Sequence, residues 1–147
     1  MHLTIHNALL DKTLQPVNIG IKDGKIAVLT AETIGPGERA IDAQGAMVSP
    51  PFIESHFHLE NALLWDAPNQ SGTLHEAIEI YAEIKKNLDT PDIVKRATMA
   101  LRAAVANGTL WLRNHVDIDH IAKLTLLDGI VATRDKFKDI IDVEIIA

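Results

Sequence analysis

The hydrophobic pattern of this chain changes its period near Phe52, and this change constrains the fold more than any other feature. From Phe52 onward, segments with the twofold period of a strand alternate with segments that have a helical period. The order is strand, helix, helix, strand, helix and strand, and the last four segments are residues 90–107, 109–116, 120–137 and 143–147. This alternation predicts parallel strands joined by right-handed crossovers. No helix follows the last strand, so the layout predicts the beginning of a larger α/β fold.

Signals at the helix ends support the helical segments. Thr73 and Glu76 form a capping-box pattern in front of an apolar stripe. Thr90 is expected to cap the second helix, with Pro91 at its first position. Gly129 falls inside the third predicted helix and weakens its local propensity, because glycine is unfavourable in a helix interior.

The first 48 residues have a different pattern, with short runs of β-forming residues and no helical spacing. Asp23 and Gly24 separate two of these runs, and an Asp-Gly pair in that position is a strong hairpin signal. We therefore expect a small antiparallel, β-sandwich-like unit over residues 1–48 and an α/β unit over residues 49–147.

Composition excludes several classes of protein. The chain of 147 residues has a formal net charge of −6, which argues against nucleic acid or an anionic membrane as a partner. It has no cysteine, so disulfides and thiolate sites are excluded. The first residues do not resemble a secretory leader, and no apolar run approaches the roughly 18–20 residues of a membrane span. We expect a cytoplasmic protein.

Two histidines, His56 and His58, stand one residue apart at the end of the first strand of the α/β unit. Residues two apart in a strand point to the same face, so both rings can reach one ion. Two polar residues on a solvent-facing surface are the alternative, because a chain with 7 histidines contains such a spacing by chance. The position favours the ion, since parallel α/β barrels place their sites at the C-terminal ends of strands.

Several separated motifs then point to one family. The stretches that carry the resemblance are PPFIESHFHLE, NQSGTLHEAIE, ANGTLWLRNHVDID and DIIDVEIIA. Together they resemble the amidohydrolase superfamily and, within it, the cytosine deaminase branch. The resemblance implies an incomplete (β/α)8 TIM-type barrel, of which this chain holds about the first three βα units. A full barrel takes about 250 residues, and roughly a hundred follow the N-terminal unit here.

The resemblance also implies one divalent metal, Fe2+ or Zn2+, with His56 and His58 as its ligands from the first strand. Neutral imidazole suits both ions, and a metal-bound water is a usable nucleophile near neutral pH. In the family this water attacks an amidine-like ring carbon of a small nucleobase-like substrate, and ammonia leaves. A catalytic zinc takes about three protein ligands plus water. The family's further ligands and its acid/base glutamate lie on later strands, so we expect the chain alone to be inactive.

Two carboxylates are weaker candidates for the catalytic acid/base. Glu54 and Glu60 are the nearest to the histidine pair in sequence. The twofold period places Glu54 on the face of His56 and His58, where it is expected to hydrogen-bond a ligand histidine. Glu60 is expected in the loop that shapes the pocket.

The motif positions also suggest residues around the substrate. Leu74 and Trp65 are candidate substrate-binding residues, although Leu74 is equally explained as a core leucine. His115 lies near the end of the second strand, where the family has its metal centre; a solvated or hydrogen-bonded histidine is the alternative. A cap of the next helix is the alternative role of Asp117 or Asp119.

Departures from the family pattern leave the substrate open. Glu60 stands where the family more often has Asp, and Asn114 stands where Thr is common. The loop around Trp65 also differs from that of well-known members. Triazines and other cyclic amidines are therefore alternative substrates.

Two rival functions are not excluded by the sequence. The chain is alternatively a non-catalytic remnant or interaction module, or an unrelated metal-binding or β-sandwich protein. Its parallel strands should be covered on both faces, and an open edge favours pairing. We therefore expect self-association or pairing with a complementary barrel half.

Overall fold

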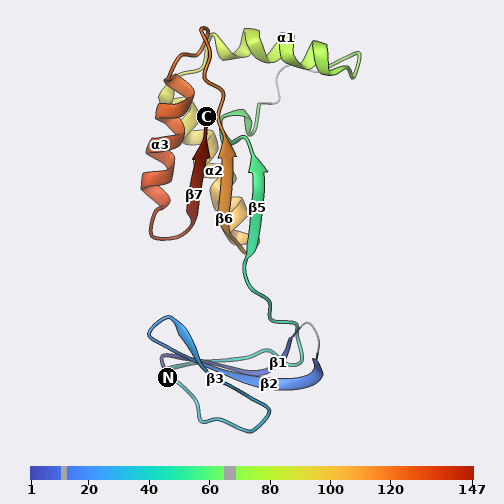
Figure 1. Ribbon diagram of the computed structural model, residues 1–147, viewed down its shortest axis with the longest axis vertical. Helices are drawn as coiled ribbons and strands as arrows, with labels where there is room; N and C mark the ends of the chain where they lie inside the picture. Colours follow the sequence, from blue (N-terminus) through green and yellow to red (C-terminus); the bar gives the residue numbers. More distant parts are fainter. Residues whose placement is uncertain (11–12, 65–68) are drawn as a thin grey trace. The chain divides into compact units, whose positions relative to one another are not determined.

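A computed structural model describes residues 1–10, 13–64 and 69–147 of the chain. The chain divides into two compact units, Met1–Pro50 and Pro51–Ala147 (Figure 1). The division falls two residues after the boundary expected from the sequence.

The first unit contains a four-stranded sheet in the order β3-β2-β1-β4. Its strands are β1 (Leu3–Leu10), β2 (Thr13–Lys22), β3 (Lys25–Thr30) and β4 (Arg39–Asp42). β1, β2 and β3 are antiparallel neighbours, whereas β4 runs parallel to β1. The described part of this unit is therefore one mixed sheet, and the purely antiparallel arrangement expected from the sequence is wrong for β4.

The predicted hairpin joins β2 and β3. Lys22 pairs with Lys25, and the two residues between them are Asp23 and Gly24. Both turn residues have positive φ, 51° and 72° respectively. This is the conformation of a type I′ turn, which matches the twist of the flanking strands and favours Asp-Gly. The local sequence signal is confirmed.

The second unit contains a three-stranded parallel sheet in the order β5-β6-β7. Its elements are β5 (Phe52–Phe57), the short 3-10 helix η1 (Leu59–Asn61), α1 (Leu74–Lys85), α2 (Thr90–Ala106), β6 (Thr109–His115), α3 (Thr125–Phe137) and β7 (Asp142–Ile146). The predicted alternation of strands and helices is confirmed in type and order. None of the helices in the described ranges is both long enough and apolar enough to cross a membrane.

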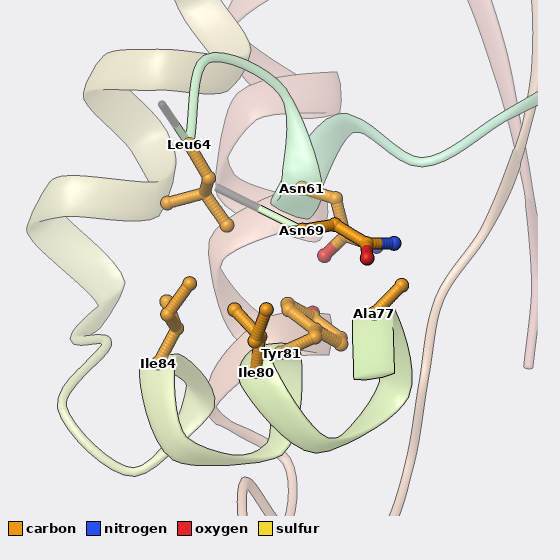
Figure 2. Close-up of a pocket in the computed structure, with 7 residues that line it drawn as sticks. All are labelled: Asn61, Leu64, Asn69, Ala77, Ile80, Tyr81 and Ile84. Carbon is orange, nitrogen blue, oxygen red and sulfur yellow. The ribbon is translucent and has the colours of Figure 1, made fainter. Parts of the chain in front are cut away.

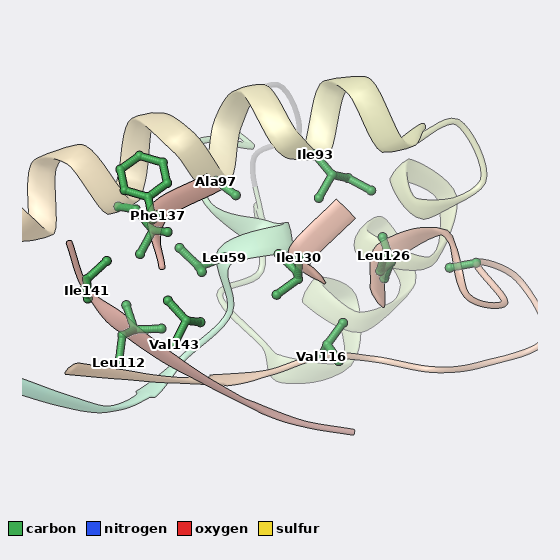
Figure 3. Packing of buried hydrophobic residues seen from close by; sticks show 12 residues of the cluster. Leu59, Ile93, Ala97, Leu112, Val116, Leu126, Ile130, Phe137, Ile141 and Val143 are labelled. Carbon is green, nitrogen blue, oxygen red and sulfur yellow. The ribbon is translucent and has the colours of Figure 1, made fainter. Parts of the chain in front are cut away.

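The core of the second unit lies between the sheet and helices α2 and α3 (Figure 3). The fully buried side chains include Ile93 and Leu101 of α2, Leu126 and Ile130 of α3, and Leu112 of β6. Leu59 of η1 is also buried in this cluster. The core therefore extends to the turn that follows His58, and it fixes the end of β5.

Two helix starts differ from the sequence expectations. The cap of α2 is Asp89 rather than Thr90, because the Asp89 side chain accepts the Asp92 N–H at 2.8 Å. α3 begins at Thr125 rather than at residue 120. The N–H groups of residues 121 and 122 donate to Asp119, and Lys123 has a positive φ of 53°, which interrupts a helix.

Gly129 lies where α2 and α3 approach each other closely. A Cβ at this position would lie 2.5 Å from Cγ2 and 2.8 Å from Cβ of Ile93. The glycine that weakens the local helix propensity is therefore required by the packing of the two helices.

Replacing Gly129 with alanine is expected to lower the free energy of unfolding by about 1–2 kcal/mol. Overpacking typically costs about 1–3 kcal/mol, and the better helix propensity of alanine returns up to about 1 kcal/mol. Urea unfolding measures the difference. Gly35→Ala, where the new Cβ meets nothing within 4 Å, is the control. A Gly129→Ala protein as stable as wild type would contradict the close packing.

Candidate active site

Three histidine rings gather at the C-terminal ends of β5 and β6. The ring centroids of His56 and His58 are 5.3 Å apart, with the rings edge to face. His115, the last residue of β6, stacks on His56 with centroids 4.1 Å apart and an interplanar angle of 15°. Its centroid lies 6.2 Å from that of His58. Parallel pairing of β5 with β6 thus brings together residues that are far apart in the sequence.

An irregularity in β5 separates the histidines from Glu54. The register of β5 against β6 shifts between Glu54 and Phe57, and Glu54 pairs with the buried Leu112. Glu54 lines a pocket with residues of α2, so it lies toward the helices and not on the histidine face. Its carboxylate accepts the backbone N–H of His56 at 3.0 Å, whereas a bond to a histidine ring was expected. The twofold period fails here because of the register shift.

Glu60 is fully buried and is hydrogen-bonded through both carboxylate oxygens. Its Oε1 lies 3.1 Å from Nδ1 of His58, and its Oε2 accepts Nδ2–H of Asn114 at 3.1 Å. Asn114, also fully buried, accepts the Leu59 N–H at 2.6 Å. Glu60 is therefore part of a buried polar network under the histidines, where the sequence placed it in a pocket-shaping loop.

Arg96 of α2 holds the backbone of the same turn. Its Nη1 donates to the carbonyl oxygen of Glu60 at 2.6 Å and to that of Ala62 at 2.8 Å. Its Nε donates to Asp92 at 2.7 Å, one helical turn earlier. Only 7% of Arg96 is exposed, so these bonds lie largely out of water, where charged hydrogen bonds are strong. The guanidinium links α2 to the turn that follows His58.

The histidine pair fits part of a metal site. Imidazole binds Zn2+ at about 2.0–2.1 Å, so two rings on one tetrahedral ion have centroids on the order of 5 Å apart. The separation of His56 and His58 agrees with this value. Within the described residues, no group of three histidine, cysteine or acidic side chains is arranged to hold an ion. The pair therefore fits two ligand positions and leaves the others to be supplied by other groups.

His115 is a neutral member of the cluster at pH 7. Its pKa lies below the ordinary histidine value, first because desolvation disfavours the charged ring. Positive charge on His56, His58 and Arg113 acts in the same direction, and Glu144 opposes it. A neutral ring is compatible with the close stacking on His56.

Lys85 forms a second polar cluster, with the loop after β6. Its ammonium donates to Asp119 at 2.6 Å and to Asp117 at 3.2 Å, and 8% of its side chain is exposed. Burial acts to lower the pKa of Lys85, but the two carboxylates outweigh it and the pKa is raised. Hydrogen bonds from Lys85 and then from the Ala122 N–H lower the pKa of Asp119 to about 2. Asp119 therefore has two roles. It accepts the N–H groups of the turn before α3, and it binds Lys85 at the C-terminal end of α1.

Acid should weaken this cluster in a specific pH range. The folded pKa of Asp119 is below its ordinary value, so its stabilising effect is present above pH ~4 and is lost as the pH falls toward ~2. Between about pH 5 and pH 3, wild type is expected to lose about 1 kcal/mol more of its free energy of unfolding than Asp119→Asn. Denaturant unfolding at each pH measures this difference. The exposed Asp139→Asn is the control, and equal acid sensitivity of wild type and Asp119→Asn would contradict the expectation.

A cavity of about 250 Å3 lies between the turn after β5 and helix α1 (Figure 2). It is lined by Asn61, Leu64, Asn69, Ala77, Ile80, Tyr81 and Ile84. The hydroxyl of Tyr81 is buried, and its pKa is raised above the ordinary range, first by desolvation and then by the charge of Glu60. The site histidines are not among the described lining residues, so this cavity is separate from their cluster.

The two expected substrate residues have different outcomes. Leu74 is the first residue of α1 and is 77% exposed, so its interpretation as a core leucine is wrong. Its role in a substrate pocket stays a prediction. Trp65 lies outside the described residues.

Two residues with largely buried polar contacts, Arg96 and Lys85, had no role in the sequence interpretation. Arg96 lies between Ile93 and Ala97 in the apolar stripe of α2, and a buried arginine requires partners. The charge of Arg96 within this apolar stripe was the sequence signal for a buried, hydrogen-bonded arginine. For Lys85 no comparable signal exists, because a lysine at the C-terminal end of a helix is ordinary.

Comparison with known proteins identifies a family. Residues 39–143 match the model of the amidohydrolase family. N-isopropylammelide isopropyl amidohydrolase of Pseudomonas sp. (strain ADP) is 30% identical over 154 aligned residues, which cover 99% of this chain and 38% of that protein.

Solved structures show the same similarity. The 5-methylcytosine deaminase of Klebsiella pneumoniae liganded with 5-fluorocytosine matches with a TM-score of 0.88 and 32% identity, over 98% of this chain and 36% of that one. N-isopropylammelide isopropylaminohydrolase of Burkholderia multivorans matches with a TM-score of 0.80 and 26% identity, over 99% and 37%. The chain thus spans well under half the length of these relatives. It belongs to the amidohydrolase family, in its cytosine deaminase-like branch.

Proposed function

We propose that this chain is the first, ligand-bearing part of a (β/α)8 barrel that hydrolyses a C–N bond of a cyclic amidine such as cytosine. The observation that carries the proposal is the pair of His56 and His58 at the C-terminal end of β5, with centroids 5.3 Å apart. The parallel β5-β6-β7 order, with a helical crossover between successive strands, supports the barrel. Membership of the amidohydrolase family supports the reaction class.

His56 and His58 would hold a divalent ion, Fe2+ or Zn2+, together with ligands from later strands. Such an ion supplies, when bound, a water acidic enough to act as a nucleophile near neutral pH. The chain's own part is to position the two rings. His58 is fixed by Glu60, and His56 is fixed by stacking on His115.

Glu60 is unsuited to proton transfer, since both its oxygens are engaged and it is fully buried. Glu54 lies toward α2, away from the rings. We therefore assign neither the role of acid/base, and proton transfer to the leaving nitrogen falls to residues of the later strands.

The substrate proposed first is a pyrimidine amidine, on the similarity to the 5-methylcytosine deaminase. An N-alkylated triazine is the second candidate. It is favoured by the 30% identity to the isopropylammelide enzyme over 99% of this chain.

A complementary barrel half is the proposed partner of this chain, and self-association is expected where that half is missing. β5 and β7 are the outer strands of the parallel sheet. Phe52 and Ile53 of β5 are 63% and 67% exposed. Exposed apolar residues on an outer strand favour pairing. Sedimentation of the chain tests this, and a monomer at high micromolar concentration would contradict it.

The function is tested with a hybrid in which residues 1–147 replace the matching part of the Klebsiella pneumoniae 5-methylcytosine deaminase. With Fe2+ or Zn2+ added, the hybrid is expected to release ammonia from cytosine or isopropylamine from N-isopropylammelide. The 147-residue chain alone is expected to release neither, because it offers two ligands and no proton shuttle. A folded, metal-loaded hybrid that is inactive on both would contradict the proposal. Turnover by the chain alone, lost in Glu54→Gln, would show a complete small enzyme instead.

A further inference from the structure

We propose that Glu60 is a positioning residue that holds His58 in the tautomer with its proton on Nδ1, which leaves Nε2 free to bind a metal ion. The metal-binding consequence rests on the proposed function, whereas the tautomer does not. The observation is a chain of hydrogen bonds that runs from His58 through Glu60 and Asn114 to the Leu59 N–H.

The carboxylate of Glu60 determines which ring nitrogen carries the proton. An ionised carboxylate accepts hydrogen bonds and donates none. His58 Nδ1, 3.1 Å from Oε1, must then be the donor. In a neutral ring the other nitrogen, Nε2, is unprotonated and has the lone pair that a metal requires. A carboxylate behind a ligand histidine also raises the basicity of that ligand.

Asn114 fixes the donor-to-acceptor direction of the hydrogen bonds in this network. Its Oδ1 is occupied by the Leu59 N–H at 2.6 Å, so its Nδ2 must face Glu60 and can only donate. The Glu60 oxygens therefore face an obligatory donor at Oε2 and His58 at Oε1. Because Glu60 and Asn114 are fully buried, water is not available to replace either bond.

Arg96 holds the backbone of the turn that carries Glu60. It binds the carbonyl oxygens of Glu60 and Ala62 and is itself held by Asp92. The backbone on which the Glu60 side chain stands is thus tied to α2. This fixes the backbone position from which the carboxylate reaches His58.

Glu60→Gln tests the proposal because an amide has only one acceptor oxygen. Asn114 needs that oxygen, so the new amide nitrogen must face His58 and donate to Nδ1. The ring proton should then move to Nε2. Long-range 1H–15N spectra of the 15N-histidine-labelled chain, recorded where the rings are neutral, distinguish the two tautomers, and His58→Asn assigns the signals. We expect Nδ1–H in wild type and Nε2–H in Glu60→Gln.

The double variant Glu60→Gln/Asn114→Asp is the matched rescue. The new carboxylate at position 114 still accepts the Leu59 N–H, and it also accepts from the new amide at position 60. The amide oxygen then faces His58, and the Nδ1–H tautomer should return. A merely structural role of Glu60 does not predict this reversal. Nε2–H in wild type, or Nδ1–H retained in folded Glu60→Gln, would overturn the proposal.

Zn2+ added to the same samples separates this proposal from the proposed function. Binding to the isolated chain should be weak, since two imidazoles do not complete a site. It should be roughly tenfold weaker in Glu60→Gln and restored in the double variant. The expected tautomers without any Zn2+ effect on His56 and His58 support the role of Glu60 and count against the metal site. Zn2+ binding without the tautomer switch supports the metal site and overturns the role of Glu60.

Discussion

His58→Ala is expected to reduce amine release by the hybrid enzyme by more than about 100-fold. Loss of groups that merely orient a metal ligand costs about 10- to 100-fold, and loss of the ligand itself should cost more. The change also removes one of the two side-chain partners of the buried Glu60. Steady-state release of ammonia or isopropylamine, with metal content measured on the same protein, checks the prediction. Both quantities should fall together.

The control for this variant is His75→Ala. His75 lies on α1 with 84% of its side chain exposed, and it forms an ion pair with the exposed Glu79. Its removal should leave turnover and metal content within about twofold of wild type, because exposed ion pairs contribute little. If His58→Ala retained full metal content and turnover, His58 would not be a ligand.

Arg96→Ala is expected to lower the free energy of unfolding of the 147-residue chain by about 3 kcal/mol. The carbonyl oxygens of Glu60 and Ala62 would lose their charged donor. Hydrogen bonds to charged groups are worth about 1.5–3 kcal/mol, and a buried acceptor without a partner costs about 1–3 kcal/mol. Urea unfolding followed by circular dichroism measures the change.

Arg102→Ala is the matched control on the same helix. Arg102 is exposed, so its replacement should change the free energy of unfolding by no more than about 0.5 kcal/mol. The difference between the two variants isolates the bonds to the turn after β5. Equal effects of the two substitutions would mean that Arg96 does not hold this turn.

The order of elements was predictable because it depends on periods that each segment carries by itself. The alternation after Phe52 and the Asp23-Gly24 turn are local signals, and both were read correctly. The proximity of His56 and His58 was predictable for the same reason, and their role as metal ligands stays a prediction. Local rules failed at two helix starts. The N-cap of α2 is Asp89 and not Thr90, and α3 begins later than predicted because the N–H groups of residues 121 and 122 bind Asp119.

The polar support of the candidate site was not predictable from local patterns. Glu60 appeared as a loop carboxylate, and Asn114 appeared only as a departure from a family motif. Their pairing depends on the alignment of β5 with β6 and on the turn that carries Leu59 inward. Neither the alignment nor the depth of burial can be read from one segment alone.

The bond between Leu59 and Asn114 also has a kinetic consequence, since it joins residues 55 positions apart in the chain. Contacts of such long range form only after the loop between them has closed, at a considerable cost in entropy. The orientation of His58 should therefore form only once β5 and β6 have aligned. An ion that needs this orientation would then bind the folded unit and not the unfolded chain, and would stabilise the fold increasingly as its concentration rises.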